Sequence, residues 1–264
     1  MTRIPRFPHR AALAAALVGL ACATTPLGRR QLVLFPEPEM AAMGVAAFDK
    51  LKAEMPTSKD AAKQRYVRCV AGAITAQLRP EEAPGSWEVT LFEEDSANAF
   101  ALPGGKIGVH TGLLRVATNQ DQLATVLGHE VAHVVARHSN ERVSTQYAAQ
   151  TGLQLAGAIT SGSPQLMALL GVGAQVGVLL PFSRTQESEA DMLGLDLMAR
   201  AGFDPRQSVS LWENMARAGG AGQPEFLSTH PSHGTRIQEL SARIPQVLPA
   251  YESARAAGRR PACS

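Results

Sequence analysis

The feature that most constrains this chain is the run His129-Glu130-Val131-Ala132-His133, which lies inside an apolar segment. Apolar residues recur at helical spacing around it, and Asn119 stands where a helix N-cap is expected. We therefore predict a buried helix over residues 119–137. On such a helix the two histidines lie on one face, one turn apart, so two imidazole nitrogens can reach the same metal ion.

The H-E-x-x-H spacing is typical of zinc peptidases, in which both histidines bind the metal. Glu130 adjoins the first histidine, close enough to take a proton from an attacking water without binding the metal. The alternative is a solvated helix face that carries these three polar side chains. The apolar neighbours argue against it, because buried polar groups need partners and a metal supplies one. We predict one Zn²⁺ per subunit, bound by His129 and His133, with Glu130 as general base.

A catalytic zinc takes a third protein ligand and leaves one position open. The best candidate is Glu187, in a helix predicted over residues 184–201. Asp191 lies four residues further on, on the same face, where it can accept the N–H of a ligand histidine. Glu189 points away from that face and is expected to be exposed or ion-paired. The alternative for all three acids is the charged face of a surface helix.

His138 follows His133 by five residues, so helical rotation carries it away from the ligand face. We expect it to be a positive charge at the helix C-terminus. The sequence also has no glycine where the longer H-E-x-x-H-x-x-G-x-x-H pattern requires one, which excludes that class of zinc peptidase.

The N-terminus is typical of an exported protein. Arg3, Arg6 and Arg10 precede an apolar run over residues 11–21 that is too short to span a bilayer, as in a signal peptide. Two interpretations of the following Cys22 stay open. It is either lipidated, which ends the signal at residue 22 and anchors a periplasmic lipoprotein to a membrane, or part of the ordinary cleavage site Ala21-Cys22-Ala23.

The other two cysteines are Cys69 and Cys263. An exported chain meets an oxidising compartment, in which these two can form a disulfide; two free thiols are the alternative. The net charge of +2 and the lack of a basic cluster beside aromatic residues predict no nucleic-acid partner.

We expect a tether over residues 23–39, a single domain over residues 40–250 and a loosely held tail over residues 251–264. The further predicted elements are helices at 40–51, 59–78 and from 204 on, a strand at 87–92, a hairpin of 98–102 with 106–110, and a glycine-rich helix at 166–180, in a core or on a membrane surface.

Four motifs taken in order resemble family 48 of the M series of zinc metallopeptidases, which includes HtpX, BepA, LoiP and the prenyl-protein CAAX protease. The motifs are the run over residues 98–105, the H-E-x-x-H run, Ser183-Arg184 with Glu187-Ser188-Glu189-Ala190-Asp191, and Leu227-Ser228-Thr229-His230-Pro231 with Arg236. The resemblance covers residues 92–240. The small periplasmic lipoproteins match best, because the chain lacks the membrane spans of HtpX and the helical-repeat extension of BepA.

The resemblance implies an α+β fold, mainly α, of the gluzincin-like kind. An HExxH helix and a second helix with the ExxxD motif would lie beside a small antiparallel sheet at the cleft. His129, His133 and Glu187 would bind zinc, with Glu130 as base and Asp191 behind a ligand histidine. Extended or unfolded protein substrates would add as a strand to the family's edge strand, which corresponds to Asn98, Ala99, Phe100 and Ala101.

Two residues of the last motif keep open roles. By resemblance, His230 would occupy the open zinc position and hold the enzyme inactive, or it would contact the substrate; the alternative is a plain turn before a helix. Arg236 would stabilise the oxyanion of the reaction, or only pair with an acid.

The predicted function is that of an exported endopeptidase acting on misfolded or stalled envelope proteins. The alternatives are a chaperone-like or self-inhibited lipoprotein, in which His230 plugs the zinc site, and a zinc hydrolase of cell-wall peptides.

Overall fold

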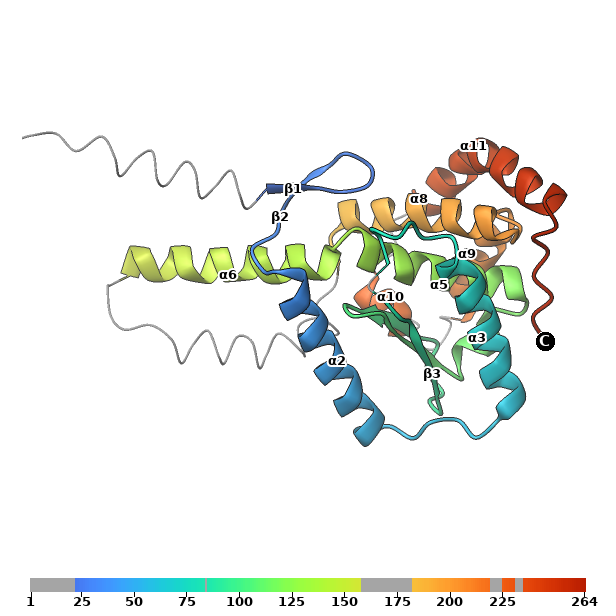
Figure 1. Ribbon diagram of the computed structural model, residues 1–264, viewed down its shortest axis with the longest axis horizontal. Coiled ribbons are helices and arrows are strands. Elements are labelled where there is room, and N and C mark those ends of the chain that lie inside the picture. The colour runs from blue at the N-terminus through green and yellow to red at the C-terminus, as the bar shows by residue number, and fades with distance from the viewer. Residues whose placement is uncertain (1–21, 84, 158–181, 219–224, 231–234) are drawn as a thin grey trace, which may run out of the picture.

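Helices make up most of the described residues and surround a small three-stranded sheet (Figure 1). The structure, a computed structural model, describes residues 22–83, 85–157, 182–218, 225–230 and 235–264. The predicted signal peptide and the glycine-rich helix at 166–180 lie outside the described residues. The elements are β1 (Cys22–Thr24), β2 (Arg30–Leu32), α2 (Glu37–Glu54), α3 (Ala61–Thr75), β3 (Glu88–Phe92), β4 (Ala99–Leu102), β5 (Lys106–His110), α4 (Leu113–Val116), α5 (Gln120–Val135), α6 (His138–Gly157), α8 (Arg184–Ala201), α9 (Gln207–Ala218), α10 (Glu225–Thr229) and α11 (Arg236–Ala256).

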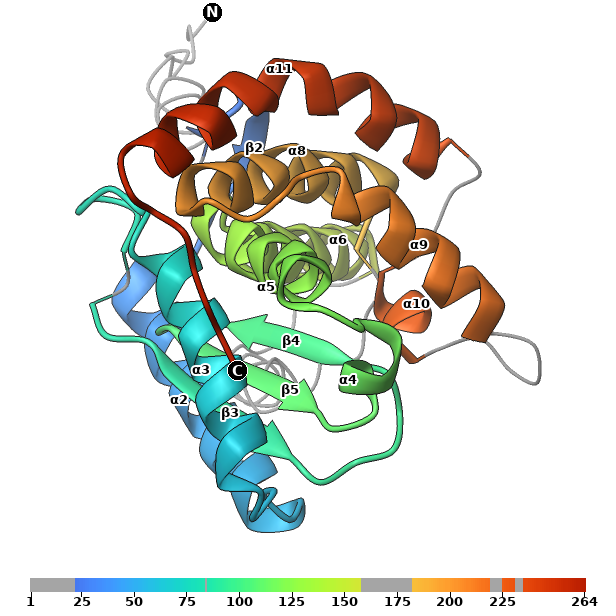
Figure 2. The same ribbon diagram turned by 90° about the vertical axis from the view of Figure 1, so that its right-hand side faces the viewer.

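Helix α5 is the centre of the fold. It lies between the sheet on one side and α8 on the other, and α11 covers α8 (Figure 2). The side chain of Asn119 accepts the N–H groups of Asp121 and Gln122, which caps the start of α5 as predicted. The helix ends before Arg137, whose φ of 58° is left-handed and turns the chain into α6.

The three-stranded sheet has the order β3-β5-β4. β4 and β5 pair antiparallel, which is the predicted hairpin, whereas β3 runs parallel to β5. Side chains alternate between two apolar layers. Ala99 and Ala101 belong to the main core with α3 and α5, and Phe100 and Leu102 pack with Phe48 of α2 on the opposite face. The sheet is therefore covered on both faces.

The segment over residues 23–39 differs from the expected tether. β1 and β2 form a short antiparallel hairpin, and α2 begins at Glu37, within the expected tether. Arg29, in the connection between the two strands, forms ion pairs with Glu141 of α6 and Glu189 of α8. These contacts join segments more than 100 residues apart, so no local sequence pattern reveals them.

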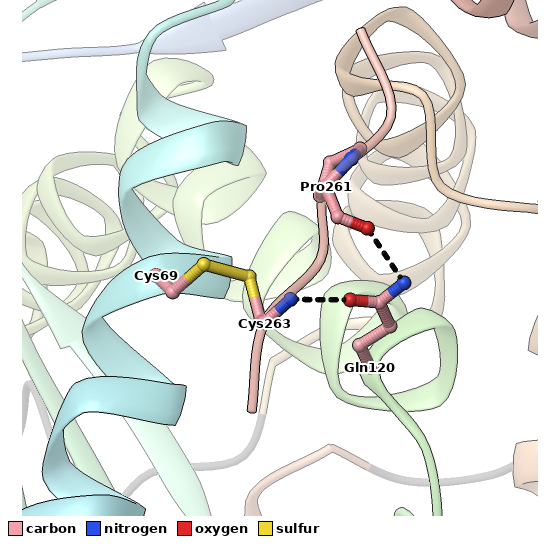
Figure 3. Close-up of a disulfide and its surroundings, with 4 residues drawn as sticks. All are labelled: Cys69, Gln120, Pro261 and Cys263. Carbon is pink, nitrogen blue, oxygen red and sulfur yellow. Dashed lines mark hydrogen bonds between the residues drawn. A yellow bond between two sulfur atoms is a disulfide. The ribbon is translucent and has the colours of Figure 1, made fainter.

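The C-terminal segment also differs from the expectation of a loosely held tail. Helix α11 continues through Ala256, and the chain then runs back along α3 (Figure 2). The side chain of Gln120 donates to the carbonyl of Pro261 and accepts the N–H of Cys263, and Cys263 forms a disulfide with Cys69 (Figure 3). Residues 261–263 are thereby held against α3 and the start of α5.

Replacing Cys69 with serine is expected to lower the free energy of unfolding by about 2–4 kcal/mol, because the bond closes a loop of 194 residues in the unfolded chain. Urea unfolding followed by circular dichroism measures the loss. Wild-type protein in reductant serves as the control and should unfold like the variant. If the oxidised wild type and the variant were equally stable, the expected stabilisation by the disulfide would be contradicted.

No helix among the described residues is both long enough and apolar enough to cross a membrane.

Candidate metal centre

Two glycines let α5 and α8 approach each other closely. A Cβ at Gly194 would lie 2.7 Å from the backbone nitrogen of His129, and a Cβ at Gly128 would lie 2.8 Å from the carbonyl oxygen of Gly194. Any side chain at either position would force the helices apart. The contact brings the H-E-x-x-H motif of one helix next to the E-x-x-x-D motif of the other.

Four buried side chains converge where these helices cross. His129 and His133 come from α5, Glu187 from α8, and His230 follows α10; their ligand atoms all lie within 4.8 Å of one another. The Nε2 atoms of the two α5 histidines are 3.0 Å apart. The carboxylate oxygens of Glu187 lie 3.5 Å from Nε2 of His129 and 3.4 Å from Nε2 of His133. The structure thus brings together the three side chains predicted as ligands.

The donor set fits a metal ion. Two imidazole nitrogens and a carboxylate facing one point are the ligands of a catalytic zinc. Burial alone would raise the pKa of Glu187, but the nearby His129 and the hydrogen bonds with His133 and His230 hold this pKa well below its usual range. Glu187 is therefore a carboxylate, the form that binds a cation.

Glu130 lies beside this cluster and is itself buried. Its Oε2 accepts the backbone N–H of Ala101 at 3.1 Å. Its Oε1 lies 3.3 Å from Nε2 of His230 and forms no hydrogen bond with any described group. Burial raises the pKa of the Glu130 carboxyl, which increases its affinity for a proton. One oxygen is thus fixed and the other is available to a reacting water.

Asp191 and Arg236 support the ligands from behind. Oδ1 of Asp191 lies 2.9 Å from Nδ1 of His129, as predicted for a group that orients this ring. Arg236 is fully buried and donates to Glu187 at 2.9 Å and to Asp191 at 2.7 Å, while its guanidinium covers the ring of Trp212. Of the two roles left open for Arg236, the geometry supports pairing with acids.

β4 is an edge strand of the sheet, and one side of it faces the cluster. The N–H of His110 in β5 donates to the carbonyl of Asn98, so the backbone groups of Asn98 face β5. Backbone direction alternates along an antiparallel pair, which turns the groups of Ala99 and Ala101 the other way. The bond from Ala101 to Glu130 shows that this second edge faces the metal ligands. Among the described strands, β4 has only β5 as a neighbour.

His230 is buried and makes direct contact with the other candidate ligands. Its Nδ1 donates to Glu187 at 3.0 Å and lies 3.2 Å from Nε2 of His129. The ring stacks on Phe226 with centroids 4.4 Å apart and on Phe182 with centroids 5.1 Å apart. The prediction of a plain turn therefore does not account for this residue, which fills the remaining side of the cluster.

The prediction for His138 was wrong. This residue is fully buried, and its Nδ1 lies 2.9 Å from Nδ1 of His133. The left-handed Arg137 breaks the helical rotation that the prediction assumed, and the first residue of α6 returns to the ligand side. Glu189 was expected to be exposed or ion-paired. It is ion-paired, and it is buried. Burial opposes ionisation, but hydrogen bonds with His138, Thr25 and Arg29 lower the pKa of Glu189 to about 2.

The fold and the arrangement of these side chains are those of a gluzincin-like peptidase domain. The defining features are the helix with the HExxH motif, the second helix that supplies Glu187 and the edge strand beside them. Residues 61–244 match the model of peptidase family M48, and the chain belongs to this family.

The relatives that this chain resembles include proteins with two different names. It is 44% identical over 162 residues to the mitochondrial metalloendopeptidase OMA1 of Schizosaccharomyces pombe. The aligned region covers 61% of this chain and 47% of that protein. It is 37% identical over 242 residues to the OMA1 of Bos taurus, covering 86% and 45%. It is 31% identical over 218 residues to the beta-barrel assembly-enhancing protease of Yersinia pestis, covering 79% and 44%. The chain spans less than half the length of each of them.

Proposed function

We propose that this chain is an exported, zinc-dependent endopeptidase that hydrolyses peptide bonds in misfolded or stalled envelope proteins. One observation carries the proposal. The ligand atoms of His129, His133 and Glu187 converge beside the buried carboxylate of Glu130 and the edge strand β4. The relative named as a beta-barrel assembly-enhancing protease and the predicted signal peptide support an envelope setting.

The chain's own residues supply most of the proposed chemistry. Zinc, when bound, polarises the scissile carbonyl and lowers the pKa of a water. Glu130 accepts a proton from the attacking water on Oε1, which forms no hydrogen bond with a described group, while Ala101 holds its other oxygen in place. The raised pKa of Glu130 favours this uptake. Glu130 then gives the proton to the leaving amine.

The position of β4 at the edge of the sheet indicates the class of substrate. An extended peptide can pair with the backbone groups of Ala99 and with the carbonyl of Ala101. Main-chain pairing requires only that the substrate backbone is extended, so it gives little sequence selectivity. Folded proteins rarely offer such a segment, so the substrates in this proposal are unfolded or stalled chains.

Membrane attachment in this proposal is a lipid on Cys22. Its support is the sequence pattern at the end of the predicted signal peptide. Mass spectrometry of the mature N-terminus separates the two interpretations. A diacylglycerol-modified Cys22 supports the anchor, and a free N-terminus after Ala23 contradicts it.

The test of the function combines metal analysis with cleavage of casein. The purified chain is expected to contain about one zinc per subunit and to cleave casein. A chelator should abolish cleavage and added zinc should restore it. A muropeptide digest in parallel tests the cell-wall alternative. Zinc-loaded protein that leaves casein intact would overturn the proposed activity.

A self-inhibited state is the second candidate, because His230 fills the remaining side of the metal cluster. If this ring blocks the site, His230→Ala is expected to raise casein cleavage about tenfold, the change that corresponds to a plugged state favoured by about 1.4 kcal/mol. Zinc content should be unchanged, because three ligands remain. Reduced cleavage by a folded, zinc-loaded variant would instead indicate a contact of His230 with substrate.

A further inference from the structure

We infer that His138 and Glu189 position the metal ligand His133. Arg29 of the N-terminal hairpin contributes to this positioning by holding the carboxylate of Glu189 in place. The inference rests on the proposed zinc site. It concerns three residues that lie outside the ligand set and that come from three different segments of the chain. They act through His133 and are positioning residues.

A continuous line of polar contacts runs from the ligand to the hairpin. Nδ1 of His133 lies 2.9 Å from Nδ1 of His138, and Nε2 of His138 lies 3.2 Å from Oε2 of Glu189. The same carboxylate oxygen accepts the Nε–H of Arg29 at 2.8 Å. His138 and Glu189 are both buried, so water does not substitute for these contacts.

The contacts fix where the protons lie. The Glu189 carboxylate only accepts hydrogen bonds, so the facing Nε2 of His138 must carry a proton. In the neutral ring Nδ1 then has a lone pair, and it must accept the Nδ1–H of His133. His133 is left with its lone pair on Nε2, the atom that faces Glu187 and His129. Glu189 therefore selects, through His138, the tautomer of His133 that can bind a metal.

The second ligand histidine has a matching arrangement. His129 presents Nδ1 to Asp191, and Arg236 pairs with that carboxylate. On the other side, Arg29 pairs with the carboxylate of Glu189. From each of the two imidazoles, polar contacts thus lead to a buried carboxylate, and an arginine forms an ion pair with that carboxylate. The difference is that His138 is inserted between His133 and its carboxylate.

Arg29 connects the N-terminal hairpin to this arrangement. Its two terminal nitrogens donate to both carboxylate oxygens of Glu141 at 2.5 and 2.7 Å, which orients the guanidinium toward Glu189. Within the hairpin, the backbone N–H of Thr25 donates to the carbonyl of Arg29 at 2.8 Å. The turn that carries Arg29 is therefore fixed at both ends, and the hairpin becomes part of the support of the metal site.

The test measures zinc affinity in the full-length Glu130→Gln protein, in which self-cleavage is not expected. Competition with a chelator gives the dissociation constant for Zn²⁺, and the absorption spectrum of bound Co²⁺ reports ligand geometry. His138→Ala is expected to weaken zinc binding about 10- to 100-fold and to alter the cobalt spectrum. His138→Gln, whose carbonyl oxygen can accept from His133, should recover part of the affinity. Arg29→Ala should weaken binding several-fold.

Arg206→Ala is the matched control, because Arg206 forms an exposed ion pair with Asp204 and has no contact with the metal cluster. Thermal unfolding of the metal-free proteins separates positioning from folding, since only variants that are folded at the assay temperature enter the comparison of zinc affinities. Folded Arg29→Ala and His138→Gln variants that bind zinc like the Arg206→Ala protein would overturn the inference. Failure of the wild type to cleave casein would overturn only the proposed proteolysis, because the zinc affinities do not depend on it.

Discussion

Replacing Glu130 with glutamine is expected to lower casein cleavage by about three orders of magnitude and to leave the zinc content at the wild-type level. The amide has the shape of the carboxylate and can still accept the N–H of Ala101 through its oxygen. It cannot take a proton from water at neutral pH. The loss therefore falls on the proton transfer and not on the metal site, in which Glu130 is not a ligand.

The measurement compares initial rates of casein cleavage with zinc content determined on the same samples. Glu213→Gln is a suitable control, because Glu213 is an exposed residue of α9 and should retain wild-type activity. A Glu130→Gln protein that cleaves casein at the wild-type rate would refute the assigned base. A variant that lost its zinc as well would place Glu130 among the ligands.

Replacing Arg236 with methionine is expected to lower the free energy of unfolding of the metal-free protein by about 3–5 kcal/mol. The guanidinium is the partner of two buried carboxylates, those of Glu187 and Asp191, and methionine fills part of its volume without its charge. Both acids would keep their burial and lose their counter-charge. Bound zinc should reduce the difference, since it supplies positive charge next to Glu187.

Urea unfolding in the presence of a chelator measures the loss of stability of the metal-free protein. The same experiment in excess zinc measures how much bound zinc reduces that loss. Arg115→Met is the control, because the ion pair of Arg115 with Asp95 is exposed and its loss should change stability by less than about 0.5 kcal/mol. The result also separates the two roles considered for Arg236. A variant of wild-type stability with strongly reduced turnover would indicate a contact with the reaction's oxyanion instead of a structural ion pair.

The grouping of the candidate metal ligands was predictable because its determinants are local and periodic. The spacing of His129 and His133 and of Glu187 and Asp191 places each pair on one helix face wherever the helices lie. The capping side chain of Asn119 and the hairpin of β4 with β5 are equally local, and the structure has both. That the two helices meet depends on Gly128 and Gly194, a pair whose meaning appears only in three dimensions.

What the sequence did not reveal are long-range contacts and a single backbone angle. Arg29 and Glu189 are 160 residues apart, and no periodic pattern links them. The parallel pairing of β3 with β5 joins strands that are not consecutive, whereas the predicted sheet was antiparallel throughout. His138 was misplaced because helical rotation was continued through Arg137, which adopts a positive φ.

The anchored C-terminal segment has a consequence if the enzyme binds extended backbones with little sequence selectivity, as proposed. A loose, extended end of one copy would then be a possible substrate for a neighbouring copy. Cys69 and Gln120 hold residues 261–263 against two helices, which removes an extended strand from the reach of neighbouring copies. We therefore expect the oxidised protein to survive storage intact and the reduced protein to be trimmed by itself from this end.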